Sequence, residues 1–224
     1  MTSPGSTAAQ EFYGRWTRLY DLLARRTPGI VRLRRRAVAA CRLDAGDTVV
    51  EMGCGTGANL PYLRGAVGPE GTVIGVDFTR EVLDRARAHT REYENVHLVR
   101  GDATAAPIPE GVDAVLATFV AGMLSDPAGA VDDWCDLAAG GNVVLLNAAR
   151  SREPYGAPVN AVFRGVVVAS TPPTGKLRYE DDPTARLDAR IDAAHDRLRE
   201  RATAIAHETH ALGVVRLTGG EIPG

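Results

Sequence analysis

Three alternate glycines follow directly on an apolar run, and this arrangement constrains the fold more than any other feature of the sequence. The segment reads Val49-Val50-Glu51-Met52-Gly53-Cys54-Gly55-Thr56-Gly57, and a helical pattern follows it. Glycine tolerates positive φ angles and lets a ligand lie against bare backbone. A helix that starts beside such a loop offers unpaired N–H groups to an anionic group. The segment therefore predicts a strand, a ligand-binding loop and a helix of an α/β protein.

Short β-branched runs alternate with helical patterns from residue 45 onward. Near-continuous apolar strands separated by helices indicate a parallel sheet covered on both faces, so the expected fold class is a doubly wound α/β sandwich. Thr79 is favoured as a helix N-cap. We predict strands at residues 48–52, 72–77, 96–100, 112–117 and 142–147, helices at 58–67, 80–90, 128–137 and 184–201, and a final pair of strands at 203–210 and 214–221.

The segments that flank this core have a different pattern. Residues 10–41 read as two helices broken at Thr27-Pro28-Gly29. We therefore expect residues 1–43 to form an N-terminal helical cap on a catalytic domain of residues 44–224, effectively as one domain. Residues 148–183 contain four prolines and no clear regular element. A stretch of that length indicates a lid or insert, or a helix that the pattern hides.

Charge and cysteine content set further limits. Residues 1–43 carry nine arginines and two acidic residues, although the whole chain has a net charge of −2. Such asymmetry occurs on surfaces for phosphates, anionic lipid or nucleic acid, and also on ordinary solvated helix faces. Three cysteines without a CxxC pair disfavour a disulfide framework or zinc site and favour a reducing compartment. Since no apolar signal core or membrane-spanning run is visible, we expect a cytoplasmic protein.

Two acidic residues follow the second and third predicted strands. Asp77 lies 20 residues beyond Gly57, where a carboxylate can accept both hydroxyls of a ribose. Asp102 would stand at the next strand tip, beyond the ribose, where it can accept an adenine amino group. A nicotinamide dinucleotide would run the other way from the glycine loop and does not require this second acid. The pair therefore favours a different adenosine cofactor, although the loop also satisfies the GxGxxA pattern of dinucleotide-binding proteins.

Three motifs together resemble the class I S-adenosylmethionine-dependent methyltransferases. They are Glu51-x-Gly53-x-Gly55-x-Gly57, Val76-Asp77-Phe78-Thr79 and Gly101-Asp102-Ala103. The resemblance covers residues 10–147 and is strongest to the branch similar to ubiquinone, menaquinone and phospholipid methyltransferases. It implies a seven-stranded, mostly parallel sheet whose last strand is antiparallel. It also implies S-adenosylmethionine as cofactor and S-adenosylhomocysteine as product.

The resemblance assigns cofactor-binding roles by position. Glu51 and the glycine loop, which includes Cys54, would hold the methionine end of the cofactor. Asp77 would hold the ribose, and Phe78 would pack on the adenine. Asp102, together with the backbone of Ala103, would read the adenine edge.

Residues near the acceptor are assigned in the same way. Thr118 and Phe119, after the fourth strand, would lie near the sulfonium of the cofactor. The opening segment 12–21 looks like the family segment that closes over the cofactor, so its Tyr13 and Tyr20, with Phe119, are expected to contact the acceptor. The Asn/Asp-Pro-Pro-aromatic motif of DNA amino-methyltransferases does not follow the fourth strand, and we expect no DNA partner.

The activity implied by the resemblance is methyl transfer by in-line attack of an acceptor N, O or C atom. We favour a small-molecule or lipid-like acceptor, a quinone or a phospholipid, because residues 10–41 and 148–183 could together roof a pocket. The basic segment 10–42 could also rest peripherally on the anionic inner face of a membrane.

Other functions stay open at this point. No residue stands out as a general base, since His195, His207 and His210 are expected to be packed or solvated, and their spacing matches no metal site. A regulatory module that binds the cofactor without methyl transfer is therefore one alternative. An RNA methyltransferase and a nicotinamide-dependent oxidoreductase are two others, suggested by the basic start and by the GxGxxA pattern.

Overall fold

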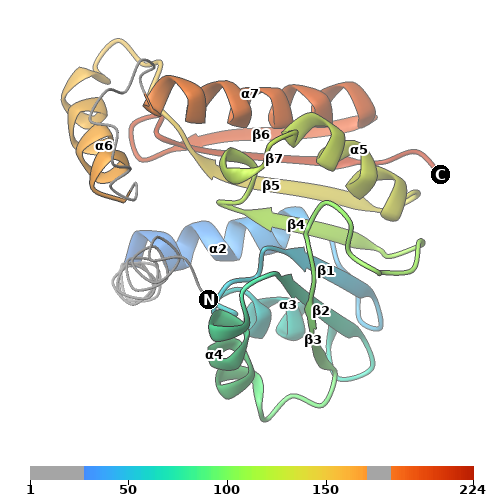
Figure 1. Ribbon diagram of the computed structural model, residues 1–224. Helices are drawn as coiled ribbons and strands as arrows, with labels where there is room; N and C mark the ends of the chain where they lie inside the picture. The colour runs from blue at the N-terminus through green and yellow to red at the C-terminus, as the bar shows by residue number, and fades with distance from the viewer. Residues whose placement is uncertain (1–27, 171–182) are drawn as a thin grey trace, which may run out of the picture.

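The computed structural model describes residues 28–170 and 183–224, which form a seven-stranded sheet with helices on both faces (Figure 1). The order across the sheet is β3-β2-β1-β4-β5-β7-β6, and β7 runs antiparallel to its neighbours β5 and β6. This is the predicted doubly wound fold with an antiparallel last strand. The strands are β1 (Thr48–Met52), β2 (Thr72–Asp77), β3 (Val96–Arg100), β4 (Ala114–Thr118), β5 (Asn142–Ala148), β6 (Ala204–His210) and β7 (Val215–Glu221).

Two groups of helices cover the two faces of the sheet. One face packs against α2 (Pro28–Ala40), α3 (Leu60–Val67) and α4 (Arg80–Thr90). The other face packs against α5 (Pro127–Leu137) and α7 (Pro183–Arg201). A short 3-10 helix, η1 (Ala121–Met123), follows β4, and α6 (Ala157–Ser170) follows β5. In Figure 1, α6 lies to the side of both layers, at the end where β4 and β5 finish.

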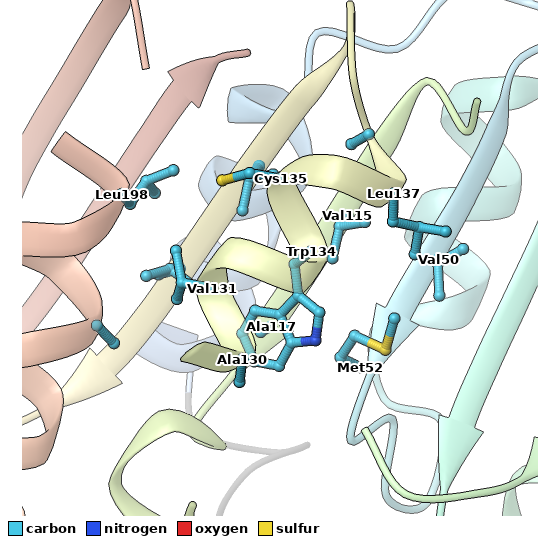
Figure 2. Packing of buried hydrophobic residues seen from close by; sticks show 14 of the residues in the cluster. Val50, Met52, Val115, Ala117, Ala130, Val131, Trp134, Cys135, Leu137 and Leu198 are labelled. Carbon is cyan, nitrogen blue, oxygen red and sulfur yellow. The ribbon is translucent and has the colours of Figure 1, made fainter. Parts of the chain in front are cut away.

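Alternating side chains of the central strands build two separate cores, because successive residues of a strand point to opposite faces. In β1, Val50 and Met52 belong to the core under α5 and α7, whereas Val49 belongs to the core under α2, α3 and α4. Figure 2 shows Trp134 of α5 in the first core, near Met52. The Trp134 indole N–H donates to the carbonyl oxygen of Ala103 at 2.8 Å, so this core also fixes the loop after β3.

Residues 148–183 include a helix where the sequence pattern predicts no regular element. Helix α6 occupies 14 residues of this segment. Pro158 misleads the prediction, because it lies in the first turn of α6, where a proline removes no helical hydrogen bond. The helix carries one charged residue, Arg164, and its Val162 and Val166 side chains are 67% and 57% exposed.

Smaller corrections concern element ends. Thr79 occupies the N-cap position of α4, but its side chain makes no capping hydrogen bond. Helix α3 begins at Leu60, two residues later than expected, and β4 begins at Ala114 and extends through Thr118. Of the two helices predicted within residues 10–41, the second is α2, and the first lies outside the described residues.

Candidate functional site

The carboxyl ends of β1, β2, β3 and β4 meet at one edge of the sheet. Strand β1 pairs in parallel with both β2 and β4, and β2 pairs in parallel with β3. The loops that follow Met52, Asp77, Arg100 and Thr118 therefore emerge together. Open α/β sheets bind ligands at this edge, where the chain reverses its order beside β1. All the predicted site residues within the described part of the chain lie in these loops or immediately before them.

The glycine loop leaves one side of its backbone open. Gly53, Gly55 and Gly57 have φ angles of 66°, 54° and 77°, a region that strongly favours glycine. A Cβ at Gly53 would lie 2.2 Å from Val120 Cγ2, so no side chain fits there. A Cβ at Gly55 would meet nothing within 4 Å. The loop is therefore packed at Gly53 and presents bare backbone at Gly55, where a ligand can approach closely.

Asp77 connects the glycine loop to the start of α4. Its Oδ2 accepts a hydrogen bond from the Gly55 N–H at 3.0 Å, and its Oδ1 accepts one from the Thr79 N–H at 2.9 Å. Each carboxylate oxygen can accept a further hydrogen bond, so both remain able to bind hydroxyl groups. The neighbouring Phe78 is 72% exposed, which leaves its ring accessible to a planar ligand.

Asp102 lies one strand further along the same edge. Its Oδ1 accepts hydrogen bonds from the backbone N–H and the hydroxyl of Thr104, at 2.9 and 2.8 Å. These bonds lower the pKa of the Asp102 carboxyl, which is exposed and ionised at neutral pH. The Ala103 carbonyl oxygen accepts the Trp134 N–H, and this hydrogen bond holds the loop in which the Ala103 amide lies.

Glu51 lies buried at the end of β1, with 1% of its surface exposed. Its Oε1 accepts hydrogen bonds from Asn59 Nδ2 at 2.5 Å and from the Thr118 hydroxyl at 3.4 Å. Its Oε2 is buried and has no hydrogen-bond partner among the described residues. Burial raises the pKa of Glu51 to about 7, although the hydrogen bonds and Arg34 act in the opposite direction. A buried carboxyl oxygen without a donor is unfavourable, so this atom marks a place for a ligand donor.

Asn59 and Arg34 complete this buried network and were not predicted from the sequence. Asn59, the N-cap residue of α3, also donates from Nδ2 to Thr118 Oγ1 at 3.0 Å. Arg34 of α2 donates from Nη1 to Asn59 Oδ1 at 2.7 Å and is 5% exposed. One signal could have marked Arg34 as buried. It shares the apolar face of its helix with buried Ala37 and Val38, at helical spacings of three and four residues.

The backbone turns sharply after β4. Phe119 has a φ of 60°, which is uncommon for an aromatic residue, and its N–H donates to the carbonyl oxygen of Leu146 at 2.7 Å. Strained residues of this kind persist where the surrounding structure fixes them, and they cluster at ligand sites. Thr118 therefore contacts Glu51 from a rigidly held strand end. Tyr13 and Tyr20, the other two residues expected near the acceptor, lie outside the described residues.

Comparisons with known proteins agree with this geometry. Residues 49–141 match a family described as a methyltransferase domain. A demethylmenaquinone methyltransferase from Staphylococcus aureus is 36% identical over 77 residues, which cover 34% of this chain and 32% of that protein. An uncharacterized 37.1 kDa protein of transposon TN4556 from Streptomyces fradiae is 34% identical over 99 residues, which cover 43% and 29%. Residues 49–141 therefore match a methyltransferase domain, and the chain is similar to S-adenosylmethionine-dependent methyltransferases. The matched segments span about a third of each curated relative.

Solved structures show the same fold for the methyltransferase domain as a whole. A methyltransferase from Aquifex aeolicus, described as dependent on S-adenosylmethionine, superposes with a TM-score of 0.56 at 19% identity, covering 88% of this chain and 94% of that chain. S-adenosylmethionine is the cofactor of this domain family, and two observations fit it. The bare backbone at Gly55 can receive an extended ligand, and the unpartnered Oε2 of Glu51 can accept from an ammonium group.

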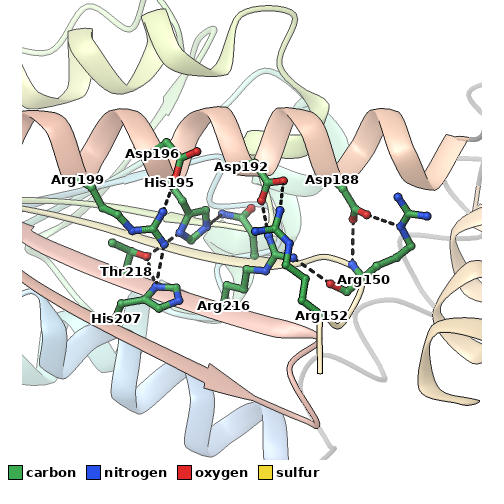
Figure 3. Close-up of polar contacts among 11 residues, drawn as sticks. Arg150, Arg152, Asp188, Asp192, His195, Asp196, Arg199, His207, Arg216 and Thr218 are labelled. Carbon is green, nitrogen blue, oxygen red and sulfur yellow. Dashed lines mark hydrogen bonds and ion pairs between the residues drawn. The ribbon is translucent and has the colours of Figure 1, made fainter. Parts of the chain in front are cut away.

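His195 and His207 share a hydrogen-bond partner, the hydroxyl of Thr218. Figure 3 shows His195 of α7 and His207 of β6 on either side of Thr218. The Nδ1 atoms of the two rings lie 2.7 and 2.8 Å from the Thr218 hydroxyl. Burial lowers the pKa of His195 to about 3, so this ring is neutral. Within residues 28–170 and 183–224, no group of three or more potential metal ligands occurs.

Proposed function

We propose that this chain transfers a methyl group from S-adenosylmethionine to a small-molecule or lipid-like acceptor. The unpartnered Oε2 of buried Glu51 supports this most directly, because the ammonium group of the cofactor supplies the missing donor. Glu51 and the glycine loop would hold the methionine end, and Asp77 the ribose. Phe78, Asp102 and the amide of Ala103 would hold the adenine.

The chemistry belongs mainly to the cofactor, which supplies an activated methyl group when bound. The residues of the chain then have to bind, orient and exclude water. Thr118 and Phe119, beside Glu51 at the end of β4, would border the space where the acceptor arrives.

Calorimetric titration with S-adenosylmethionine, S-adenosylhomocysteine and NADH tests the cofactor assignment. We expect micromolar binding of the first two and none of NADH. Asp77→Ala and Asp102→Ala should each weaken binding without unfolding the chain. Asp84→Ala is a matched control, because Asp84 is an exposed acid whose Arg87 ion pair contributes little. Binding of NADH alone, or unchanged affinity in both site variants, would overturn the assignment.

A quinone or phospholipid acceptor is supported by the apolar surface of α6. This helix stands at the end of the sheet where β4 and β5 finish (Figure 1). Its exposed Val162 and Val166, with Tyr155 just before it at 59% exposure, can contact a hydrocarbon chain. Product formation with quinones and phospholipids tests the acceptor. Cofactor binding without any methylated product would instead favour a regulatory module.

Peripheral membrane contact through residues 10–42 is part of the same proposal. Among residues 28–42, Arg36 pairs with Glu208 and Arg42 with Glu221, so exposed Arg32 and Arg35 carry the described part of this surface. No helix among the described residues is long and apolar enough to cross a membrane. The protein should co-sediment with anionic liposomes at low salt, and an Arg32→Gln/Arg35→Gln variant should do so less. Failure of the unmodified protein to co-sediment would end this proposal.

A further inference from the structure

We propose that Arg34 and Asn59 are positioning residues that hold one oxygen of Glu51 and present the other to the ammonium group of the cofactor. The inference rests on the proposed function, because it requires the cofactor to bind at Glu51. It extends the site beyond the segment that matches the methyltransferase family, residues 49–141, to helix α2.

The orientation of the Asn59 amide follows from the chemistry of its neighbours. A guanidinium group has only donors, so the Asn59 atom that faces Arg34 Nη1 at 2.7 Å must be the amide oxygen. The Nδ2 group then faces the opposite way, and its two hydrogens are directed at Glu51 Oε1 and Thr118 Oγ1. A flipped amide would turn its oxygen toward the Glu51 carboxylate, where two acceptors repel each other. Arg34 therefore fixes the orientation of Asn59.

The same network determines which oxygen of Glu51 is available. Oε1 receives the hydrogen bonds from Asn59 and Thr118, and these two contacts restrict rotation of the carboxyl group. Oε2 remains buried without a hydrogen-bond partner among the described residues. An ammonium group that approaches along the glycine loop would therefore meet an acceptor already held in place, as binding with little reorganisation requires.

The charged groups around Glu51 come from several elements. Arg34 on α2 favours the ionised carboxylate, whereas Asp77 at the end of β2 disfavours it. The thiols of Cys41, just after α2, and Cys54, in the glycine loop, are also influenced by the charge of Glu51, and burial raises their pKa values so that they stay neutral. Arg34 is thus the cation that supports the carboxylate before the ammonium group arrives. Without it, more of the Glu51 population would be protonated at neutral pH.

The test compares the binding of two ligands, of which only one carries the ammonium group. S-adenosylhomocysteine carries the ammonium group, and methylthioadenosine has the same nucleoside and a thioether but no amino-acid portion. At neutral pH we expect Arg34→Met to weaken S-adenosylhomocysteine about tenfold, as for loss of a hydrogen bond to a charged group, and methylthioadenosine less than about twofold. The affinity for S-adenosylhomocysteine should fall at low pH, where Glu51 is protonated. In Arg34→Met this fall should begin at a higher pH. Exposed Arg87→Met on α4 is the control and should leave both ligands and the pH profile unchanged.

The outcomes separate this inference from the proposed function. Equal losses for both ligands in Arg34→Met, or an unchanged pH profile, would mean a purely structural role and would overturn the inference. If Arg34→Met does not fold, Arg34→Lys replaces it, because lysine keeps the charge but cannot reproduce the guanidinium geometry, and it should weaken S-adenosylhomocysteine alone. A wild-type protein that binds neither ligand would overturn the proposed function as well.

Discussion

Replacing Glu51 with glutamine should change how the stability of the ligand-free protein depends on pH. Burial raises the pKa of Glu51 from 4.5 to about 7 in the folded chain. A carboxyl with a raised folded pKa contributes its full stability below its unfolded pKa and loses that contribution as the pH rises through the folded value. At about 1.4 kcal/mol per pKa unit, the loss between pH 4.5 and pH 7 amounts to roughly 3 kcal/mol, and it levels off above pH 7.

Urea unfolding of the wild type and Glu51→Gln between about pH 4 and pH 8 measures this loss. Glutamine does not ionise, so the free energy of unfolding of Glu51→Gln, relative to the wild type, should rise by roughly 3 kcal/mol across that range. Taking the difference between the two proteins removes the contribution of every other titrating group.

Two results would refute this reasoning. A flat difference for Glu51→Gln would mean that the carboxyl has an ordinary pKa in the folded state. A difference that falls with pH would mean that Arg34 and the hydrogen bonds from Asn59 outweigh burial, so that the folded protein stabilises the carboxylate.

Three further predictions concern the glycine loop, the hydroxyl of Thr218 and the hydrogen bond from Trp134 to the loop after β3. Gly53→Ala should lower the free energy of unfolding by about 3 kcal/mol, because its Cβ would overlap Val120. Gly55→Ala should lower it by only about 1 kcal/mol but should weaken the binding of S-adenosylhomocysteine at least about tenfold. Equal losses of stability in urea unfolding would contradict this prediction. Thr218→Val removes the hydroxyl shared by two histidines and should destabilise the fold by about 1–3 kcal/mol, and an unchanged Tm would count against that role. Trp134→Phe removes the hydrogen bond to the loop after β3 and should weaken methylthioadenosine, with wild-type affinity as the contrary result.

Local signals made much of the fold and the cofactor loops predictable. The alternation of β-branched runs and helical patterns involves residues that are close together in the chain. It therefore predicted every strand of the sheet to within about two residues. Gly55 and Asp77 could be singled out because each follows directly on a strand, and parallel strands bring their carboxyl ends together.

The buried network depends on contacts that leave little trace in the local sequence. Arg34 and Asn59 are 25 residues apart, and Arg34 lies within a run of arginines of which the others are exposed or half-buried. Which member of the run points inward is decided by the packing of α2 on the sheet. Helix α6 was missed for a different reason. A proline such as Pro158 breaks a helix interior but is favoured in a first turn, and the sequence pattern alone did not separate these cases.

The position of β7 has a consequence for the order in which the chain can assemble. β7 lies between β5 and β6 in the sheet although it follows both in sequence, and the pairings of β6 are with β7. During synthesis, the outer edge of β5 therefore stays open and β6 has no strand to join until residues 215–221 leave the ribosome. The half of the sheet that contains the glycine loop can form earlier, since β1 to β4 precede this point. A nascent chain stalled before residue 215 should thus show an exposed strand edge, the kind of surface that chaperones protect.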